Sequence, residues 1–202
     1  MKSNKRTQVE RSAATRDALI AAGRSLFATR GYGEIGTEAI ARAAGVSRGA
    51  LYHQFADKID LFTAVFESVE AELIAGIEIA LAESAETDPV ALMRLGAGCW
   101  LDACSEPEIL RIALIEAPSV LGWVRWREIG DHYGVGLAAR LITAAIALGR
   151  VAPQPVAPLA HVLVGALRES ALYLAAASDR AGARMEVGAV IDRMIQALAV
   201  DA

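Results

Sequence analysis

The 202-residue sequence has few of the residues that stabilise small secreted proteins or bind metals, with two cysteines, three histidines and 5% aromatic residues. Cys99 and Cys104 lie close together in a segment with helical spacing, so we interpret both as reduced thiols. The three histidines are scattered along the chain and lack the spacing of metal ligands. The sequence therefore predicts no disulfide framework, no metal site and no cofactor.

Long apolar segments are also absent. No uninterrupted apolar run reaches about 18 residues, the length that spans a bilayer. The most apolar stretch, residues 151–167, is interrupted by Pro153, Pro155 and Pro158. The first 17 residues are polar, which argues against a signal peptide. We therefore expect a cytoplasmic protein without a membrane span.

The composition is that of a globular helical protein. Apolar residues make up 54% and charged residues 22% of the chain, which excludes a disordered protein. Alanine and leucine are abundant, and we find no segment with the period-two alternation of a half-buried strand. We predict an all-α fold of about nine helices, preceded by a polar, disordered and basic arm over residues 1–11.

Charge is distributed unevenly along the chain, whose formal net charge is −4. Residues 1–58 contain ten Lys/Arg and five Asp/Glu, a net charge of +5. Residues 59–202 contain ten Lys/Arg and nineteen Asp/Glu, a net charge of −9. A basic first quarter joined to an acidic remainder indicates that the first part binds a polyanion and the second does not.

Three short helical patterns near the N-terminus predict a helix-turn-helix. The first begins near Thr15 and ends at Gly31, the second ends at Gly45, and the third covers residues 48–54. Gly45 permits the tight turn between the second and third helices. Such a motif leaves the outer face of its last helix free to enter the major groove of DNA.

Seven residues in and beside this motif are candidates for contact with DNA: Thr37, Ser47, Arg48, Gly49, Tyr52, His53 and Lys58. Arg48 can hydrogen-bond a guanine edge or neutralise a phosphate, and the glycine after it lets the backbone approach DNA closely. Thr37 and Ser47 are predicted helix N-caps first, and could also bind phosphate. The alternative interpretation is structural: a short helix tolerates the glycine, the tyrosine packs half-buried and the histidine faces solvent.

Residues 31–36 match the pattern G-x-G-x-x-G of dinucleotide-binding loops. That function requires a strand before the glycines, so that the next helix directs its N-terminus at a pyrophosphate. The segment before Gly31 has helical spacing instead. We therefore interpret residues 31–36 as a loop between two helices.

Residues 15–66 read TRDALIAAGRSLFATRGYGEIGTEAIARAAGVSRGALYHQFADKIDLFTAVF. With this segment the N-terminal part resembles the TetR (tetracycline-repressor) family of bacterial transcriptional regulators. The resemblance implies an all-helical homodimer with a DNA-binding domain, residues 1–56, and an effector-binding and dimerisation domain, residues 57–202.

The resemblance also assigns functions to single residues. It implies that Arg48, the glycine after it, Tyr52 and His53 face DNA, and that Thr37 and Lys58 hold phosphates. The family often has histidine immediately before the phenylalanine that ends this motif, where the present sequence has Gln54. A phosphate contact at that position is therefore not carried over.

The last two predicted helices, about residues 159–177 and 182–200, are apolar on more than one face. A surface helix of a monomer needs only one apolar stripe, so the second face predicts a four-helix bundle across a two-fold axis. The predicted interface residues are Leu163, Ala166, Leu167, Leu174, Ile191, Met194, Ile195 and Leu198. The alternative is that both faces pack in the core of a monomer.

A ligand pocket is expected inside the C-terminal domain. Aromatic and sulfur-containing side chains there suit a large apolar or aromatic effector. The candidate lining residues are Met93, Trp100, Cys104, Ile112, Trp123, Trp126, Tyr133, His161 and Tyr173. For each of them the alternative is packing in the core.

These features predict a ligand-responsive transcriptional regulator, a repressor that binds a palindromic operator of double-stranded DNA as a dimer. Its release by a small-molecule effector is implied by the resemblance. An enzyme is the second class, but the sequence signals assemble no nucleophile–base pair, carboxylate pair or metal cluster. The third class is a helical interaction protein whose N-terminal domain binds polyanions without sequence specificity.

Overall fold

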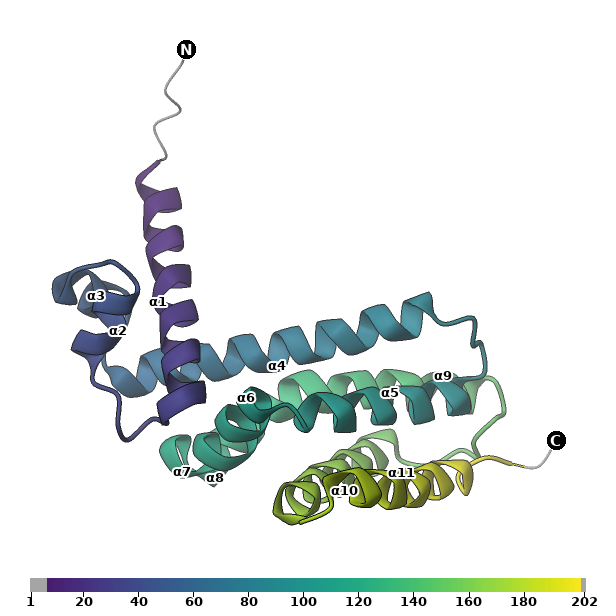
Figure 1. The fold of residues 1–202 in the computed structure, drawn as a ribbon. Coiled ribbons are helices and arrows are strands. Elements are labelled where there is room, and N and C mark those ends of the chain that lie inside the picture. The colour runs from purple at the N-terminus through teal and green to yellow at the C-terminus, as the bar shows by residue number, and fades with distance from the viewer. Residues whose placement is uncertain (1–6, 201–202) are drawn as a thin grey trace.

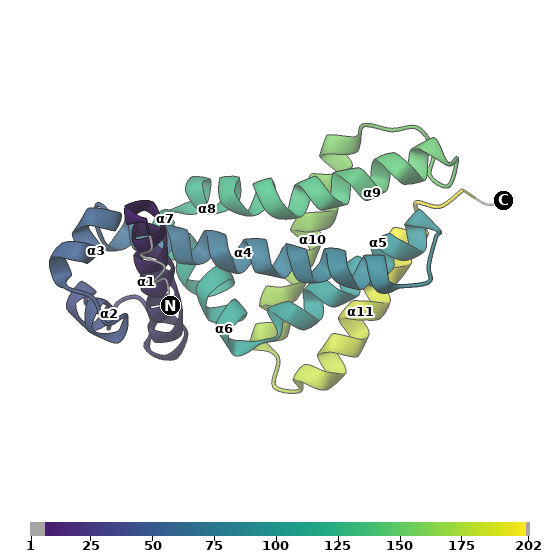
Figure 2. The same cartoon turned by 90° about the horizontal axis from the view of Figure 1, so that it is seen from above.

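The computed structural model describes residues 7–200, which form helices joined by short loops (Figures 1 and 2). The first helices are α1 (Gln8–Arg30), α2 (Thr37–Ala43), α3 (Arg48–Gln54) and α4 (Lys58–Glu83). The others are α5 (Pro89–Cys104), α6 (Pro107–Ile109), η1 (Leu110–Glu116), α7 (Ala117–Leu121), α8 (Trp123–Gly130), η2 (Asp131–Val135), α9 (Gly136–Ala147), α10 (Val156–Ala176) and α11 (Arg180–Gln196). Since α6–η1–α7 and α8–η2–α9 are each continuous, residues 7–200 form nine helical runs, which confirms the predicted all-α fold.

The helices are arranged as a small group at one end of a layered bundle (Figure 1). We call α1–α3 the head and α4–α11 the body. The head packs at the N-terminal end of α4, and α4 continues from there along the body. Below α4 lie α5 and α9, and α10 and α11 cover the opposite side of these two helices (Figures 1 and 2). Thus α4 belongs physically to both parts.

The start of α1 differs from the prediction. Residues 8–11 are helical, so the expected disorder is wrong for them, while residues 1–6 lie outside the described part. Thr7 and Glu10 form a capping box: the Glu10 N–H donates to Thr7 Oγ1 (3.2 Å) and the Thr7 N–H donates to Glu10 Oε2 (2.7 Å). These bonds satisfy N–H groups that a helix start leaves free. A helix can therefore begin in a segment with few apolar residues.

One apolar core extends from the head into the body. Phe27 of α1 and Phe62 of α4 lie 5.2 Å apart in an edge-to-face arrangement, and both are fully buried. The same cluster includes Leu51 of α3 and Ile112 of η1. The core therefore crosses the predicted domain boundary between residues 56 and 57, so the head and α4 share one packed interior.

Two π-helical turns interrupt the body helices. One is η1, between α6 and α7, and the other is η2, between α8 and α9. The second falls in the glycine-rich segment 130–136. π-helical turns are rare and occur often at functional sites, and η2 indeed lies beside the cavity considered below.

By length and composition alone, α10 could cross a membrane, with a mean hydropathy of 1.3 over 18 residues. One such helix is weak evidence for a membrane span, because the core helix of a soluble protein can have the same length and apolar composition. The helix also contains Arg168 and Glu169, and it packs on α5, α9 and α11. The face of α10 that points away from these helices is exposed, and such a face can contact a second copy of the chain.

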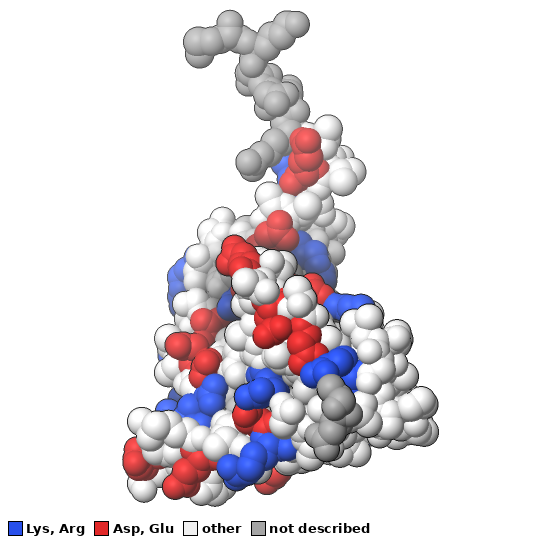
Figure 3. Space-filling model, turned by 90° about the vertical axis from the view of Figure 1, so that its right-hand side faces the viewer, with Lys and Arg blue, Asp and Glu red and all other residues white. Residues whose placement is uncertain are grey.

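The charge of the body is mixed rather than uniform on the face that Figure 3 shows, where basic and acidic side chains alternate. Several arginines of the body pair with carboxylates. Arg150 Nε lies 3.0 Å from Asp88 Oδ1, and Arg184 Nε lies 2.7 Å from Asp102 Oδ1. This face therefore does not offer a polyanion the continuous basic surface that such binding requires.

Candidate nucleic-acid interface and body cavity

The turn between α2 and α3 is built as the sequence predicts. Gly45 has φ +67°, and its N–H donates to the Arg42 carbonyl at 3.2 Å. Ser47 caps α3, because the Ala50 N–H donates to Ser47 Oγ at 3.1 Å. Thr37 is not an N-cap: Gly36 occupies that position and Thr37 is the first residue of α2.

The outer face of α3 is exposed. Leu51 and Phe55 are buried and fix the helix on the head, whereas Arg48, Tyr52 and His53 face solvent. Gly49 is exposed as well, and a Cβ atom built on it would meet only Ser47 Oγ, at 3.8 Å. Nothing inside the described protein therefore requires glycine at position 49.

The first turn of α2 orients this face. Arg48 Nη1 lies 2.8 Å from Glu38 Oε1, and the Thr37 and Tyr52 hydroxyl oxygens lie 3.1 Å apart. The Arg48 guanidinium lies 5.6 Å from the centre of the Tyr52 ring. The hydrogen bond with Thr37, followed by the effect of Arg48, holds the pKa of Tyr52 below its usual value. The sequence did not predict the pairing of Glu38 with Arg48, since the two residues lie ten positions apart.

Lys58, at the start of α4, has an internal partner. Its Nζ donates to the Tyr32 carbonyl at 2.6 Å and lies 3.9 Å from the centre of the Tyr32 ring. Burial lowers the pKa of Lys58, and the charge of Glu116 opposes this effect. The ammonium thus stabilises the loop between α1 and α2, and its contact with phosphate stays a prediction.

Gln54 also serves the head internally. Its Nε2 donates to Ser12 Oγ at 2.8 Å, and Arg16 Nη1 donates to the Gln54 carbonyl at 3.2 Å. The Arg16 guanidinium covers the Phe55 ring at 4.4 Å. These contacts attach the C-terminal end of α3 to α1, so the departure from the family pattern at position 54 has a structural use.

The glycine-rich segment 31–36 is a loop between α1 and α2, and a helix rather than a strand precedes it. Gly31 has φ +86°, and its N–H donates to the Phe27 carbonyl at 2.9 Å. This geometry ends α1 and directs no helix N-terminus at a dinucleotide. The interpretation as a loop is confirmed.

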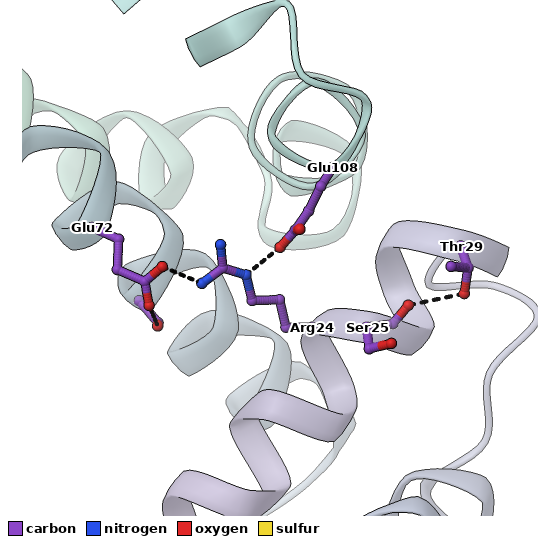
Figure 4. A network of polar contacts seen from close by, with 6 residues as sticks. Arg24, Ser25, Thr29, Glu72 and Glu108 are labelled. Atoms are coloured by element: carbon purple, nitrogen blue, oxygen red, sulfur yellow. Dashed lines mark hydrogen bonds and ion pairs between the residues drawn. The ribbon is translucent and has the colours of Figure 1, made fainter. Parts of the chain in front are cut away.

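Polar contacts connect the head to the body at α6 and η1. Arg24 of α1 bridges Glu72 of α4 and Glu108 of α6 (Figure 4). Arg111 Nη1 donates to the Thr29 carbonyl at 3.0 Å. These contacts were not predicted, because the partners lie far apart in sequence and most charged residues of helices are solvated.

The body encloses an apolar cavity of about 70 Å³ between α4, α5, α9 and α10. Two of the nine predicted pocket residues, Met93 and Trp100, line it. Its other walls include Ile74 and Leu137, which the sequence analysis did not single out, and Leu167, which was predicted at the dimer interface. Helical spacing alone does not distinguish a cavity wall from a filled core.

The other seven predicted pocket residues lie elsewhere, which corrects the prediction. Ile112 and Trp126 are buried in the core shared with the head, and Trp126 Nε1 donates to the Ala113 carbonyl at 2.8 Å. Cys104 is buried beside a second, smaller cavity of about 20 Å³. The remaining four residues do not line the apolar cavity, and they are exposed or partly buried: Trp123, Tyr133, His161 and Tyr173.

The predicted interface residues divide into two groups. Leu174, Ile191 and Ile195 are buried in the core of the body, and Leu163 and Leu167 line its cavity, so these five do not form an outer face. Met194 is exposed, and Ala166 and Leu198 are partly buried. Besides Met194, the exposed large apolar residues of α10 and α11 are Val162, Leu172, Tyr173, Met185 and Val190. Exposed apolar side chains therefore occur on both helices, whereas the prediction named mainly residues that face inward.

Together, these features define an all-helical protein with a helix-turn-helix head and a separate helical body. The family model of bacterial regulatory proteins of the tetR family matches residues 19–65. The model of the tetracyclin repressor-like C-terminal domain matches residues 90–198, more than half of the chain. The chain belongs to the TetR family of bacterial transcriptional regulators, whose members bind DNA operators, typically as dimers.

Individual relatives agree with this assignment. A TetR-family regulator from Pectobacterium atrosepticum is 32% identical, with a TM-score of 0.83 over 97% of this chain and 99% of its own. The regulator CymR of Pseudomonas putida is 36% identical over 90 residues, which is 45% of this chain and 44% of CymR. RolR, solved with the ligand resorcinol, is 20% identical with a TM-score of 0.66 over 93% of this chain and 90% of RolR, and so shares the fold. CymR and the Pectobacterium atrosepticum protein are transcriptional regulators.

Proposed function

We propose that the protein is a cytoplasmic, ligand-responsive transcriptional repressor without catalytic activity. It binds a two-fold-symmetric operator of double-stranded DNA as a homodimer, through residues 1–56, and residues 57–202 bind the effector and the second copy. The observation that carries this proposal is the exposed face of α3, on which Arg48 and Tyr52 are held by the first turn of α2.

The chemistry of this face suits DNA. A guanidinium can donate two hydrogen bonds to the edge of a guanine, and hydroxyl groups such as those of Tyr52 and Ser47 donate to phosphate. At Gly49 the absence of a side chain leaves the helix backbone free to approach the groove. His53 and Thr37 flank these residues, and Lys58 would reach a phosphate by sharing or leaving its Tyr32 contact.

The exposed apolar face of α10 and α11 supports dimerisation. Val162 and Tyr173 on α10 and Met185 on α11 are all more than half exposed in the single chain. Packing these helices against a second copy removes that surface from water in a four-helix bundle. Two recognition helices can then occupy successive major grooves, about 34–36 Å apart.

The body cavity supports a small effector. Its walls are apolar and include Ile74 and Ile77 of α4, the helix that carries the head. A ligand that fits better when α4 is displaced favours a state with a different spacing of the two heads. RolR, with the same fold, was solved with a small aromatic ligand, which supports an effector of comparable size here.

Selection of binding sites from a random duplex pool, at near-physiological salt, tests this function. We expect enrichment of a two-fold-symmetric site by the wild type and its loss in Arg48→Ala and Tyr52→Ala. Arg140→Ala is the matched control, because Arg140 is an exposed arginine of α9, paired with Glu78 of the body, and should retain selection. Retention of DNA without any enriched sequence would contradict the proposal and favour a non-specific polyanion binder.

A further inference from the structure

The apolar cavity of the body has polar neighbours on its side nearer the head. Glu70, Cys104 and Arg168 each lie one helical turn from a residue that lines the cavity, and Tyr133 is adjacent in sequence to one. Burial raises the pKa of Cys104, and the charge of Glu70 adds to this effect. The pKa of Tyr133 is raised by burial and by the charges of Glu67 and Glu70. The polar groups from α4, α5, α10 and η2 are therefore near enough to interact.

Within this group the positive charge is already neutralised. Arg168, whose side chain is only 15% exposed, has Nη1 2.9 Å from Asp131 Oδ1 and its guanidinium 5.3 Å from the centre of the Trp126 ring. Asp131 also faces Arg127 at 3.4 Å and His161 at 3.6 Å. Arg168 is thus held in place, and a second anion would have to compete with Asp131.

The negative charge of Glu70 is not neutralised by contact. Among residues 7–200, no hydrogen bond or ion pair is formed by its carboxylate, although the side chain is partly buried. Burial raises the pKa of Glu70 to about 7, against the opposing charge of Arg168. Nor is the carboxylate sealed in the protein, since no side-chain oxygen of the described residues is both fully buried and without a partner. At least part of the carboxylate therefore keeps contact with solvent.

We propose that Glu70 is the polar end of the effector site, and that this site takes an apolar molecule bearing one cationic amine. The apolar part occupies the cavity beside Trp100 and Ile74, and the ammonium pairs with Glu70. This inference rests on one part of the proposed function, namely that the body binds a small molecule. A cationic ligand is favoured over a ligand with a carboxylate. The cation would pair with Glu70, which has no partner among the described residues, whereas a carboxylate would need Arg168, which is already paired with Asp131.

Three probes that differ only in their polar end test the proposal: 4-phenylbutylamine, 4-phenylbutan-1-ol and 4-phenylbutanoate. Their four-carbon chain spans about one helical turn, roughly 5 Å, which is the offset between Ile74 and Glu70 along α4. Binding is measured by calorimetry at pH 8, where Glu70 is ionised, with the full-length protein. We expect the amine to bind at least about tenfold more tightly than the alcohol or the carboxylate.

Variants locate this preference. Glu70→Gln should reduce it to less than about threefold, whereas Glu83→Gln, an exposed glutamate of the same helix, should leave it unchanged. Glu70→Met is a second variant with a similar expectation, in case the first unfolds. The proposal is overturned if the three probes bind equally, if the carboxylate binds best, if none binds, or if the Glu70 variants keep the preference.

The experiment separates this inference from the proposed function. Selection of a symmetric DNA site without a preference for the amine would refute the ligand class and leave the regulator standing. A protein that prefers the amine through Glu70 but selects no DNA site would refute the regulator and leave the ligand class standing. The two outcomes are measured on the same preparation, so a folding defect affects both and is recognised.

Discussion

The carboxylate of Glu38 lies 2.8 Å from Nη1 of Arg48, so the first turns of α2 and α3 are joined by an ion pair on the exposed face of the head. Such a surface pair contributes little to stability, about 0–1 kcal/mol. The pair instead affects the direction of the Arg48 side chain and the charge of this surface. The carboxylate limits where the guanidinium points, and it places a negative charge on the face that we propose for DNA binding.

We predict that Glu38→Gln makes DNA binding tighter and less specific. The substitution removes a charge that repels phosphate and releases Arg48 for contacts with any phosphate. Affinity for random-sequence DNA should rise about three- to tenfold, with a smaller gain for the selected operator. Fluorescence anisotropy with both duplexes at two salt concentrations measures the change, with Glu83→Gln as the charge-matched control. A constant ratio of the two affinities would show that Glu38 has no part in specificity.

Gly49→Ala should separate stability from DNA binding. The new Cβ meets only Ser47 Oγ at 3.8 Å, and alanine favours a helix over glycine by about 0.5–1 kcal/mol. The free energy of unfolding should therefore rise slightly, while operator affinity falls about tenfold or more, since a methyl group would stand between the backbone and the groove. Urea unfolding and anisotropy measure the two effects.

The matched control for this prediction is Gly76→Ala on α4. Gly76 is exposed within a helix and has no atom within 4 Å of a built Cβ, so it should gain similar stability and keep operator affinity. Equal DNA binding by Gly49→Ala and the wild type would mean that the helix merely tolerates a glycine at position 49.

The parts of the fold that were predictable are those fixed by local chemistry. Gly45 and Ser47 act on neighbours within a few residues, so their turn and cap follow from the sequence. The capping box of Thr7 and Glu10 had an equally local signal, a threonine followed three residues later by glutamate. That signal alone does not predict a helix here, because the segment lacks an apolar stripe.

The parts that were not predictable depend on which faces meet in three dimensions. On α10, Leu174 faces the core and Tyr173 faces solvent, yet both belong to apolar stripes of similar strength. Trp123 is exposed and Trp126 is buried, three residues apart on one helix. A cavity lining, an ion pair such as Arg24 with Glu72, or an isolated carboxylate such as Glu70 therefore needs tertiary structure.

The outer face of α10 provides a test of assembly. Tyr173 is 58% exposed, so Tyr173→Lys should be tolerated by the single chain and should oppose burial of this face against a second copy. We expect the dimer dissociation constant to rise at least about tenfold in sedimentation equilibrium. Ile79→Lys is the control, because Ile79 is also 58% exposed but lies on α4. If Ile79→Lys dissociates the protein and Tyr173→Lys does not, the interface lies on another face.

The isolation of Glu70 should be visible in the pH dependence of stability. Its pKa is raised by burial from an ordinary value near 4.5 to about 7, so between these values the folded chain holds the proton more tightly than the unfolded chain. The free energy of unfolding contributed by this group is therefore greatest below pH 4.5 and decreases as the pH rises to 7. Above that pH the carboxylate is ionised in both states, and the decrease is complete.

Glu70→Gln removes this dependence, and its difference from the wild type isolates Glu70 because all other titrating groups are common to both proteins. We expect the variant to be more stable at pH 8 by about 1–2 kcal/mol, less than the full shift would give because the side chain is only partly buried. At pH 5 the two proteins should be nearly equal. Urea unfolding at the two pH values measures this, with Glu83→Gln as the control. A variant that is less stable than the wild type at pH 8 would mean that the carboxylate has a partner in solution, and an amine would then find no unpaired charge at this site.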